Sequence, residues 1–224
     1  MQPPEMKKKL VLRRITVLVG CWLWLPAHGQ LVTGYPADVT AYDVREVAML
    51  PRYCIYTQSF RDKVPGGNDK AIVDGWYAQL GTAFHALHHY CWGVMKTNRA
   101  MLLTSDRVTR QFYLTGSIGE FDYVIAHVPA DFVLLPEILA KKGENLIRLG
   151  RGSAAIAELQ KATELKPDYW PPYAHMSDYY KEVGDKARAR EVLQAGLKWA
   201  PEATALQNRL ARLDVPAAKK KGSP

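Results

Sequence analysis

A repeat of 34 residues in the C-terminal half constrains this chain more than any other feature of its sequence. Residues 136–169 and 170–203 align without a gap, and residues of the same kind then stand at the same places. The matched pairs are Gly143/Ser177, Leu146/Tyr180, Gly150/Gly184, Ala155/Ala189, Leu159/Leu193, Ala162/Gly196 and Pro167/Pro201. A period of this length is typical of helix pairs that stack into an array, because each unit buries its apolar side only against its neighbours.

The residue types in these pairs fit two closely packed helices in each unit. Small residues in both helices let them approach each other, and the larger residues beside them fill the remaining space. The prolines at 167 and 201 cannot continue a helix, so they end the second helix of each unit. Residues 204–215 are then predicted to form a final helix that covers the apolar end of the array.

With these residues in register, the two stretches resemble tetratricopeptide repeats. The departures are mild: Leu139 and Tyr173 stand where the family has an early Trp, and Lys142 stands where it prefers Leu. The resemblance implies an all-α fold, a solenoid of antiparallel helix pairs with a capping C-terminal helix. It also implies a concave groove, lined by the first helix of each repeat, that binds protein segments and performs no chemistry.

The same resemblance assigns the lining of the groove. The residues expected to line it are Glu137, Ala140, Glu144, Ile147 and Arg148 from the first repeat, and Pro171, Ala174, Asp178, Lys181 and Glu182 from the second. One branch of the family grips a C-terminal carboxylate with Lys and Asn, but Glu144 and Asp178 stand where that branch has Asn. The mixed, slightly acidic lining favours a neutral or basic segment instead. The alternative interpretation of these charges is a solvated helix face.

Residues 30–135 show helical patterns but match no named family. Helices are expected over 43–50, 71–80, 83–103 and 106–128, with a helical or extended piece over 52–61. Two repeats are fewer than the usual minimum of about three for independent stability. We therefore expect the pair 83–103 and 106–128 to cover the exposed side of the first repeat, as a degenerate repeat with longer helices.

The first 29 residues have the layout of a secretory signal peptide. A basic stretch over 7–14 precedes an apolar run over 15–25, and small residues stand before a cleavage site at Gln30. The run is too short for a transmembrane helix, which needs about 20 apolar residues. The alternatives are an uncleaved membrane anchor, a lipoprotein linked through Cys21, and a twin-arginine signal.

The formal charge of +8, taken as a whole, would favour nucleic acid or an anionic membrane as a partner. Residues 1–29 hold five basic residues and one acidic residue, and the predicted disordered tail over 216–224 holds three lysines. Residues 30–218 keep 22 basic and 21 acidic residues. A nucleic-acid binder concentrates basic charge on its folded face, so nucleic acid is not expected and membrane contact is at most peripheral.

Cleavage before Gln30 would leave two cysteines, Cys54 and Cys91. Two cysteines in an oxidising compartment indicate one disulfide. On the chain-entropy model, closing this loop stabilises the fold by roughly 3–4 kcal/mol. The alternative is a pair of buried thiols.

Three of the six histidines, His85, His88 and His89, lie within five residues of one another. On a helix, His85 shares a face with His88 or His89, so two imidazoles could bind one metal ion such as zinc or copper. No further ligand is plainly supplied, and the alternative is partly buried histidines that pack beside aromatic residues. Other enzyme motifs are absent, since Gly66-Gly67 lacks the context of a phosphate-binding loop.

The sequence therefore predicts an exported, non-enzymatic interaction protein of the periplasm of a Gram-negative bacterium. Its expected role is that of a scaffold or assembly factor for a cell-envelope complex, with a protein as its partner and no cofactor. The alternative function is metal or haem handling in the periplasm by the histidine cluster.

Overall fold

The structure is a computed structural model that describes residues 42–214. The predicted signal peptide, Cys21, the segment 30–41 and the basic tail lie outside the described residues. Within the described part the chain is helical and contains no β-strand. None of the helices in this part is both long enough and apolar enough to cross a membrane.

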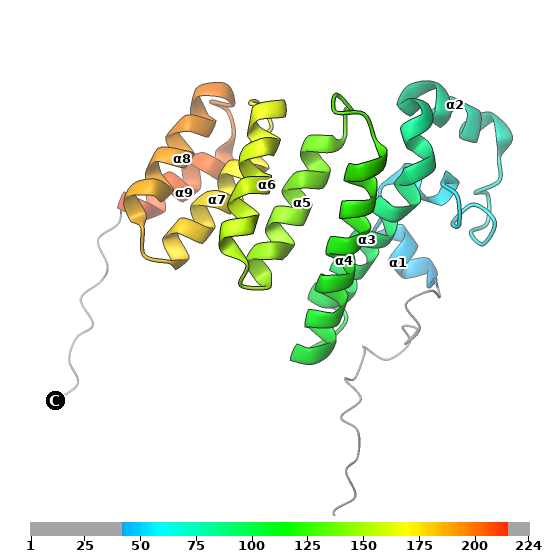
Figure 1. Ribbon diagram of the computed structural model, residues 1–224, viewed down its shortest axis with the longest axis horizontal. Coiled ribbons are helices and arrows are strands. Elements are labelled where there is room, and N and C mark those ends of the chain that lie inside the picture. Colours follow the sequence, from blue (N-terminus) through cyan, green and yellow to red (C-terminus); the bar gives the residue numbers. More distant parts are fainter. Residues whose placement is uncertain (1–41, 215–224) are drawn as a thin grey trace, which may run out of the picture.

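The helices follow one another along an elongated array (Figure 1). Their bounds are α1 Val44–Ala48, α2 Lys70–Leu80, α3 Leu87–Leu102, α4 Arg107–His127, α5 Leu135–Arg148, α6 Gly152–Leu165, α7 Pro171–Glu182, α8 Lys186–Trp199 and α9 Thr204–Asp214. Two short 3-10 helices, η1 (Arg52–Tyr56) and η2 (Gly81–Ala86), precede α2 and α3. From α3 onward each helix packs against the next, with α3–α4, α5–α6 and α7–α8 as pairs. The fold is the predicted all-α solenoid of helix pairs, and α9 packs on the last pair.

Glycine makes the tight turn inside each of the two repeats. Gly150 lies between α5 and α6 with φ of 73°, and Gly184 lies between α7 and α8 with φ of 85°. Glycine adopts this left-handed conformation freely, whereas a residue with a side chain is strained there. After the second turn, the Asp185 carboxylate accepts a hydrogen bond from the amide of Arg188 and so caps the start of α8.

Glycine also sets how closely the two helices of a pair approach. A Cβ atom added to Gly143 in α5 would lie 2.6 Å from Cγ of Leu159 in α6. In the first pair, a Cβ atom added to Gly93 in α3 would lie 2.5 Å from the ring of Phe121 in α4. Such distances are far below van der Waals contact, so both pairs depend on the missing side chain.

An aromatic core holds the N-terminal part together and continues into α5. Phe60, Phe84, Tyr90 and Phe121 are fully buried within it. The ring of Trp92 lies 5.6 Å from the ring of Phe60, measured between centroids. This core lies between η1, η2, α3 and α4, and its continuation into α5 covers the side of the first repeat that would otherwise be exposed.

A buried ion pair attaches α1 to α3. The carboxylate of Glu46 accepts two hydrogen bonds from the guanidinium of Arg99, at 2.5 and 2.9 Å. Both side chains are almost completely buried, with 0% and 1% of their surface exposed. The ring of Tyr113 lies 5.8 Å from the same guanidinium. A short helix of five residues is thereby fixed to the array by this ion pair, together with Val47, which is buried in the core.

The structure differs from the expected helices at two places. The predicted helix over 83–103 begins only at Leu87, because Gly81 turns the chain after α2 with φ of 62° and the tighter η2 follows. The expected piece over 52–61 is helical only in η1 and then continues as turns. Both segments turn inward, and they bury Phe84 and Phe60 in the aromatic core.

Candidate functional site

The first helices of the repeats form one continuous surface. α5 contacts α7, and α7 contacts α9, while α6 and α8 pack between them on the other side. We call the surface formed by α5, α7 and α9 the first-helix surface. The six charged residues that the resemblance assigned to the groove all lie on α5 or α7, and they are Glu137, Glu144, Arg148, Asp178, Lys181 and Glu182.

On α5, both acidic residues have partners within the chain. The hydroxyl of Tyr90 in α3 donates a hydrogen bond to Glu137. Glu144 forms an ion pair with Arg148 one turn later, at 2.6 Å. Burial, together with the negative charges of Glu137 and Glu144, raises the pKa of Tyr169 to about 12. The α5 part of the surface is therefore occupied by internal contacts.

On α7, Asp178, one of the two acidic residues of the surface, is neutralised by the capping helix. Arg209 in α9 donates hydrogen bonds to the carboxylate of Asp178, the shortest at 2.9 Å. A small cleft of about 120 Å³ lies between the two helices, and Lys181 and Arg212 also line it. Within the described part of the chain neither Lys181 nor Arg212 has an ion pair. The cleft thus carries positive charge.

The imidazole of His175 on α7 lies close to an acidic residue of α5. Its Nε2 is 3.9 Å from the carboxylate of Glu144. Burial lowers the pKa of His175 below its usual value, against the attraction of Glu144, which raises it. The ring is therefore neutral near pH 7.

Sequence reasoning missed the contribution of α9 to this surface. Arg212 stands 34 residues after Asp178, which itself stands 34 residues after Glu144. The repeat register, continued by one period beyond residue 203, would have placed Arg212 on the same surface. The register of complete repeats ends at residue 203, because α9 is a capping helix and not a complete repeat.

Each histidine of the cluster makes its own polar contact, and the rings of His88 and His89 lie 4.2 Å apart, measured between centroids. Nδ1 of His85 lies 3.0 Å from the hydroxyl of Tyr77, and Nδ1 of His88 donates to the carbonyl oxygen of His85 at 2.8 Å. Nδ1 of His89 lies 2.6 Å from the carboxylate of Glu120. Among residues 42–214 no three His, Cys, Asp or Glu side chains come together as a metal site. Metal or haem binding by these histidines stays a prediction.

The two cysteines lie together in the aromatic core. Cys54 in η1 and Cys91 in α3 are joined as a disulfide, with Cα atoms 5.7 Å apart. Both residues are completely buried. This geometry suits a disulfide; the formation of the bond in an oxidising compartment stays a prediction.

Comparisons with known proteins agree with this architecture. A family model of the tetratricopeptide repeat matches residues 136–169 and 171–202. The Hsp70-Hsp90 organizing protein of Triticum aestivum is 32% identical to this chain over 93 residues, which are 42% of this chain and 15% of that protein. The chain thus matches only a small part of the length of this relative. Residues 136–169 and 171–202 are therefore tetratricopeptide repeats.

Proposed function

We propose that the chain binds a segment of a partner protein along the first-helix surface and performs no chemistry there. The observation that carries this proposal is the continuity of α5, α7 and α9, which contact one another in a row. A row of helix faces offers a partner several turns of contact at once. The family resemblance implies the same binding mode, in which a protein segment lies along the first helix of each repeat. The family match over 136–169 and 171–202 supports the same conclusion.

The charges of this surface define the chemistry of the partner segment. The carboxylates of Glu144 and Asp178 are paired with Arg148 and Arg209. They therefore attract a basic side chain of a partner only weakly. Lys181 and Arg212 remain at the cleft between α7 and α9. We therefore infer a segment that places an acidic side chain at this cleft, in contrast to the neutral or basic segment expected from the sequence.

The compartment and the biological role are further parts of this proposal. The predicted signal peptide supports export to the periplasm, and the repeat architecture supports a scaffold or assembly factor in an envelope complex. Mass spectrometry of the protein recovered from fractionated cells tests the export: the mature chain should begin at Gln30 in the periplasmic fraction. A chain that keeps residues 1–29 and remains in the cytoplasm would refute the export and the envelope role. This result would not contradict the proposed binding surface.

Affinity co-purification from the envelope fraction tests the binding surface. The double substitution Lys181→Glu and Arg212→Glu reverses the charge of the cleft on two exposed side chains. The matched control, Lys161→Glu and Lys198→Glu, makes the same change on the exposed faces of α6 and α8. We expect a partner that the wild type and the control retain and that the first variant loses. Equal recovery with both variants would contradict the proposal, and recovery of Hsp70 or Hsp90 in its place would contradict the envelope role.

A further inference from the structure

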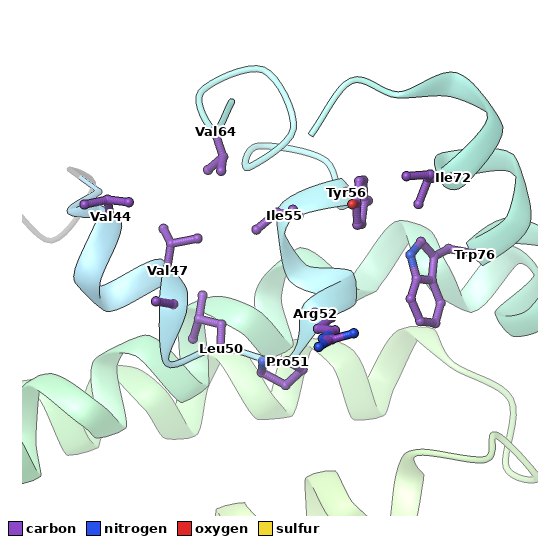
Figure 2. Close-up of a pocket in the computed structure, with 11 residues that line it drawn as sticks. Val44, Val47, Leu50, Pro51, Arg52, Ile55, Tyr56, Val64, Ile72 and Trp76 are labelled. Carbon is purple, nitrogen blue, oxygen red and sulfur yellow. The ribbon is translucent and has the colours of Figure 1, made fainter. Parts of the chain in front are cut away.

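An apolar groove lies at the opposite end of the array from α9, between α1, η1 and α2 (Figures 1 and 2). Its volume is about 610 Å³. Aliphatic side chains from these elements, among them Val44, Leu50, Ile55 and Ile72, point toward one another across it (Figure 2). Val44 is 78% exposed and Ile72 is 41% exposed, so the apolar walls are open to solvent.

The walls of the groove are fixed by contacts on their far sides. α1 is attached to α3 by the buried pair of Glu46 and Arg99. η1 is attached to α3 by Cys54, and the loop after it is held by Phe60, which is fully buried. The groove is therefore preformed, because closing it would require these buried contacts to break. Ligand sites are largely preformed in the same sense.

Three side chains in this apolar lining carry hydrogen-bond donors: Arg52, Tyr56 and Trp76. Arg52 is the one charged residue among the eleven that line the groove, and it has no ion pair within the described part of the chain. The indole nitrogen of Trp76 is buried and has no hydrogen-bond acceptor among the described residues. Figure 2 shows the Trp76 ring at the same end of the groove as Arg52. A buried donor without an acceptor is unfavourable, so the indole of Trp76 favours a ligand that brings an acceptor. Arg52 is exposed, and its positive charge favours an anionic acceptor.

From this geometry we propose that the groove binds a long-chain fatty acid, with its carboxylate at Arg52 and Trp76 and its alkyl chain along the aliphatic walls. The volume lies within the range of about 300–1,000 Å³ that is usual for small-molecule sites, which are apolar with a few polar groups that fix orientation. Eleven lining residues are fewer than the roughly 20–30 per side of a standard protein interface. A carboxylate on an apolar chain matches both the donors and the walls, and this site is separate from the first-helix surface.

Isothermal titration of the mature chain with dodecanoate, below the concentration at which it forms micelles, tests the proposal. We expect one molecule per chain, with a dissociation constant between about 1 and 100 µM. Dodecanol has the same chain without the carboxylate and should bind about tenfold more weakly. Arg52→Gln should remove most of this difference by weakening dodecanoate alone. Trp76→Phe should weaken dodecanoate by a smaller factor, because it removes only the indole donor.

A matched pair of substitutions separates the groove from the rest of the surface. Ile72→Glu places a carboxylate in the groove and should abolish binding, whereas Val133→Glu makes an equivalent change at a valine that is 64% exposed before α5 and should leave binding unchanged. The proposal is overturned if dodecanoate shows no saturable binding up to about 1 mM, or if Arg52→Gln leaves its affinity unchanged. It is also overturned if the wild type is a dimer that Ile72→Glu converts to a monomer, because a second copy would then occupy the groove.

Discussion

The N-terminal region, residues 42–128, and the repeat region, residues 135–214, are held together in different ways. In the N-terminal region, Cys54–Cys91 and Glu46–Arg99 join residues that are far apart in the sequence and completely buried. In the repeat region the ion pairs between helices are less buried. The side chains of Lys142 and Glu158 are 14% and 23% exposed, and those of Asp178 and Arg209 are 50% and 32% exposed.

This difference has a physical consequence for stability. In the repeat region similar interfaces recur between adjacent helices, so the stability is distributed over many similar contacts. In the N-terminal region a few buried links fix short elements such as α1 and η1, which have little helical stability of their own. Single substitutions should therefore lower the free energy of unfolding most in the N-terminal region.

The largest effect is expected from Arg99→Leu. It leaves the carboxylate of Glu46 buried without its cation, and breaking a buried pair in this way costs about 3–5 kcal/mol. Urea unfolding followed by circular dichroism measures the change in the free energy of unfolding. Lys70→Leu breaks the exposed pair with Asp74 and should cost less than about 1 kcal/mol. The double variant Glu46→Leu and Arg99→Leu should regain most of the loss; if it is as unstable as Arg99→Leu, the charge is not the cause.

Removal of the disulfide should have the next largest effect. Cys54→Ala with Cys91→Ala should lower the free energy of unfolding by about 3–4 kcal/mol, because the unfolded chain loses a constraint that spans a sequence separation of 37. Thiol counting on denatured, non-reduced mature protein should find no free thiol. Two free thiols would show that the bond is absent and would leave the aromatic core alone to hold η1.

A smaller effect is expected inside the repeats, from Gly143→Ala. The added methyl group would lie 2.6 Å from Cγ of Leu159, and such overpacking costs about 1–3 kcal/mol. The control is Gly119→Ala in α4, where a Cβ atom meets nothing within 4 Å. This second change should stabilise the chain by up to about 1 kcal/mol, because alanine favours the helix over glycine. Opposite signs in thermal unfolding are expected, and equal signs would contradict the close approach of α5 and α6.

The smallest effect is a pH dependence that originates from His175 in the repeat region. Its pKa in the folded chain is lowered by burial, while in the unfolded chain it lies near about 6.5. As the pH falls through this value toward the lower folded pKa, the unfolded state takes up a proton that the folded state does not, and stability falls. Unfolding measured between pH 7.5 and 5.5 should show a shallower slope in His175→Gln. An unchanged slope would assign the dependence to other groups, such as His88, whose pKa burial also lowers.

The sequence predicted the repeat region well because its structure depends on local spacing. The glycines at 150 and 184 and the small residues at 143 and 177 recur at one period. The first two make turns, Gly143 permits a close approach, and Ser177 is buried at the matching position. The same register, extended to Arg212, would also have predicted the positive cleft at α9.

The N-terminal region was predicted only in part, because its defining contacts follow no period. α3 and α4 use Gly93 against Phe121 as α5 and α6 use Gly143 against Leu159, but the longer helices place the partner further along the chain. The Glu46–Arg99 pair and the groove beside α1 depend on where turns bring distant residues together. Neither the hydrophobic pattern nor the cysteine count indicated them.

Site-specific photo-crosslinking tests the central claim, that the first-helix surface binds a partner protein, most directly. A benzoylphenylalanine at position 181 would stand at the cleft between α7 and α9, and the same residue at position 161 would stand on the exposed face of α6. On irradiation of envelope fractions, we expect a discrete adduct with one partner from position 181 and none from position 161. Adducts of equal yield from both positions, or adducts from position 161 alone, would contradict the assignment of the first-helix surface.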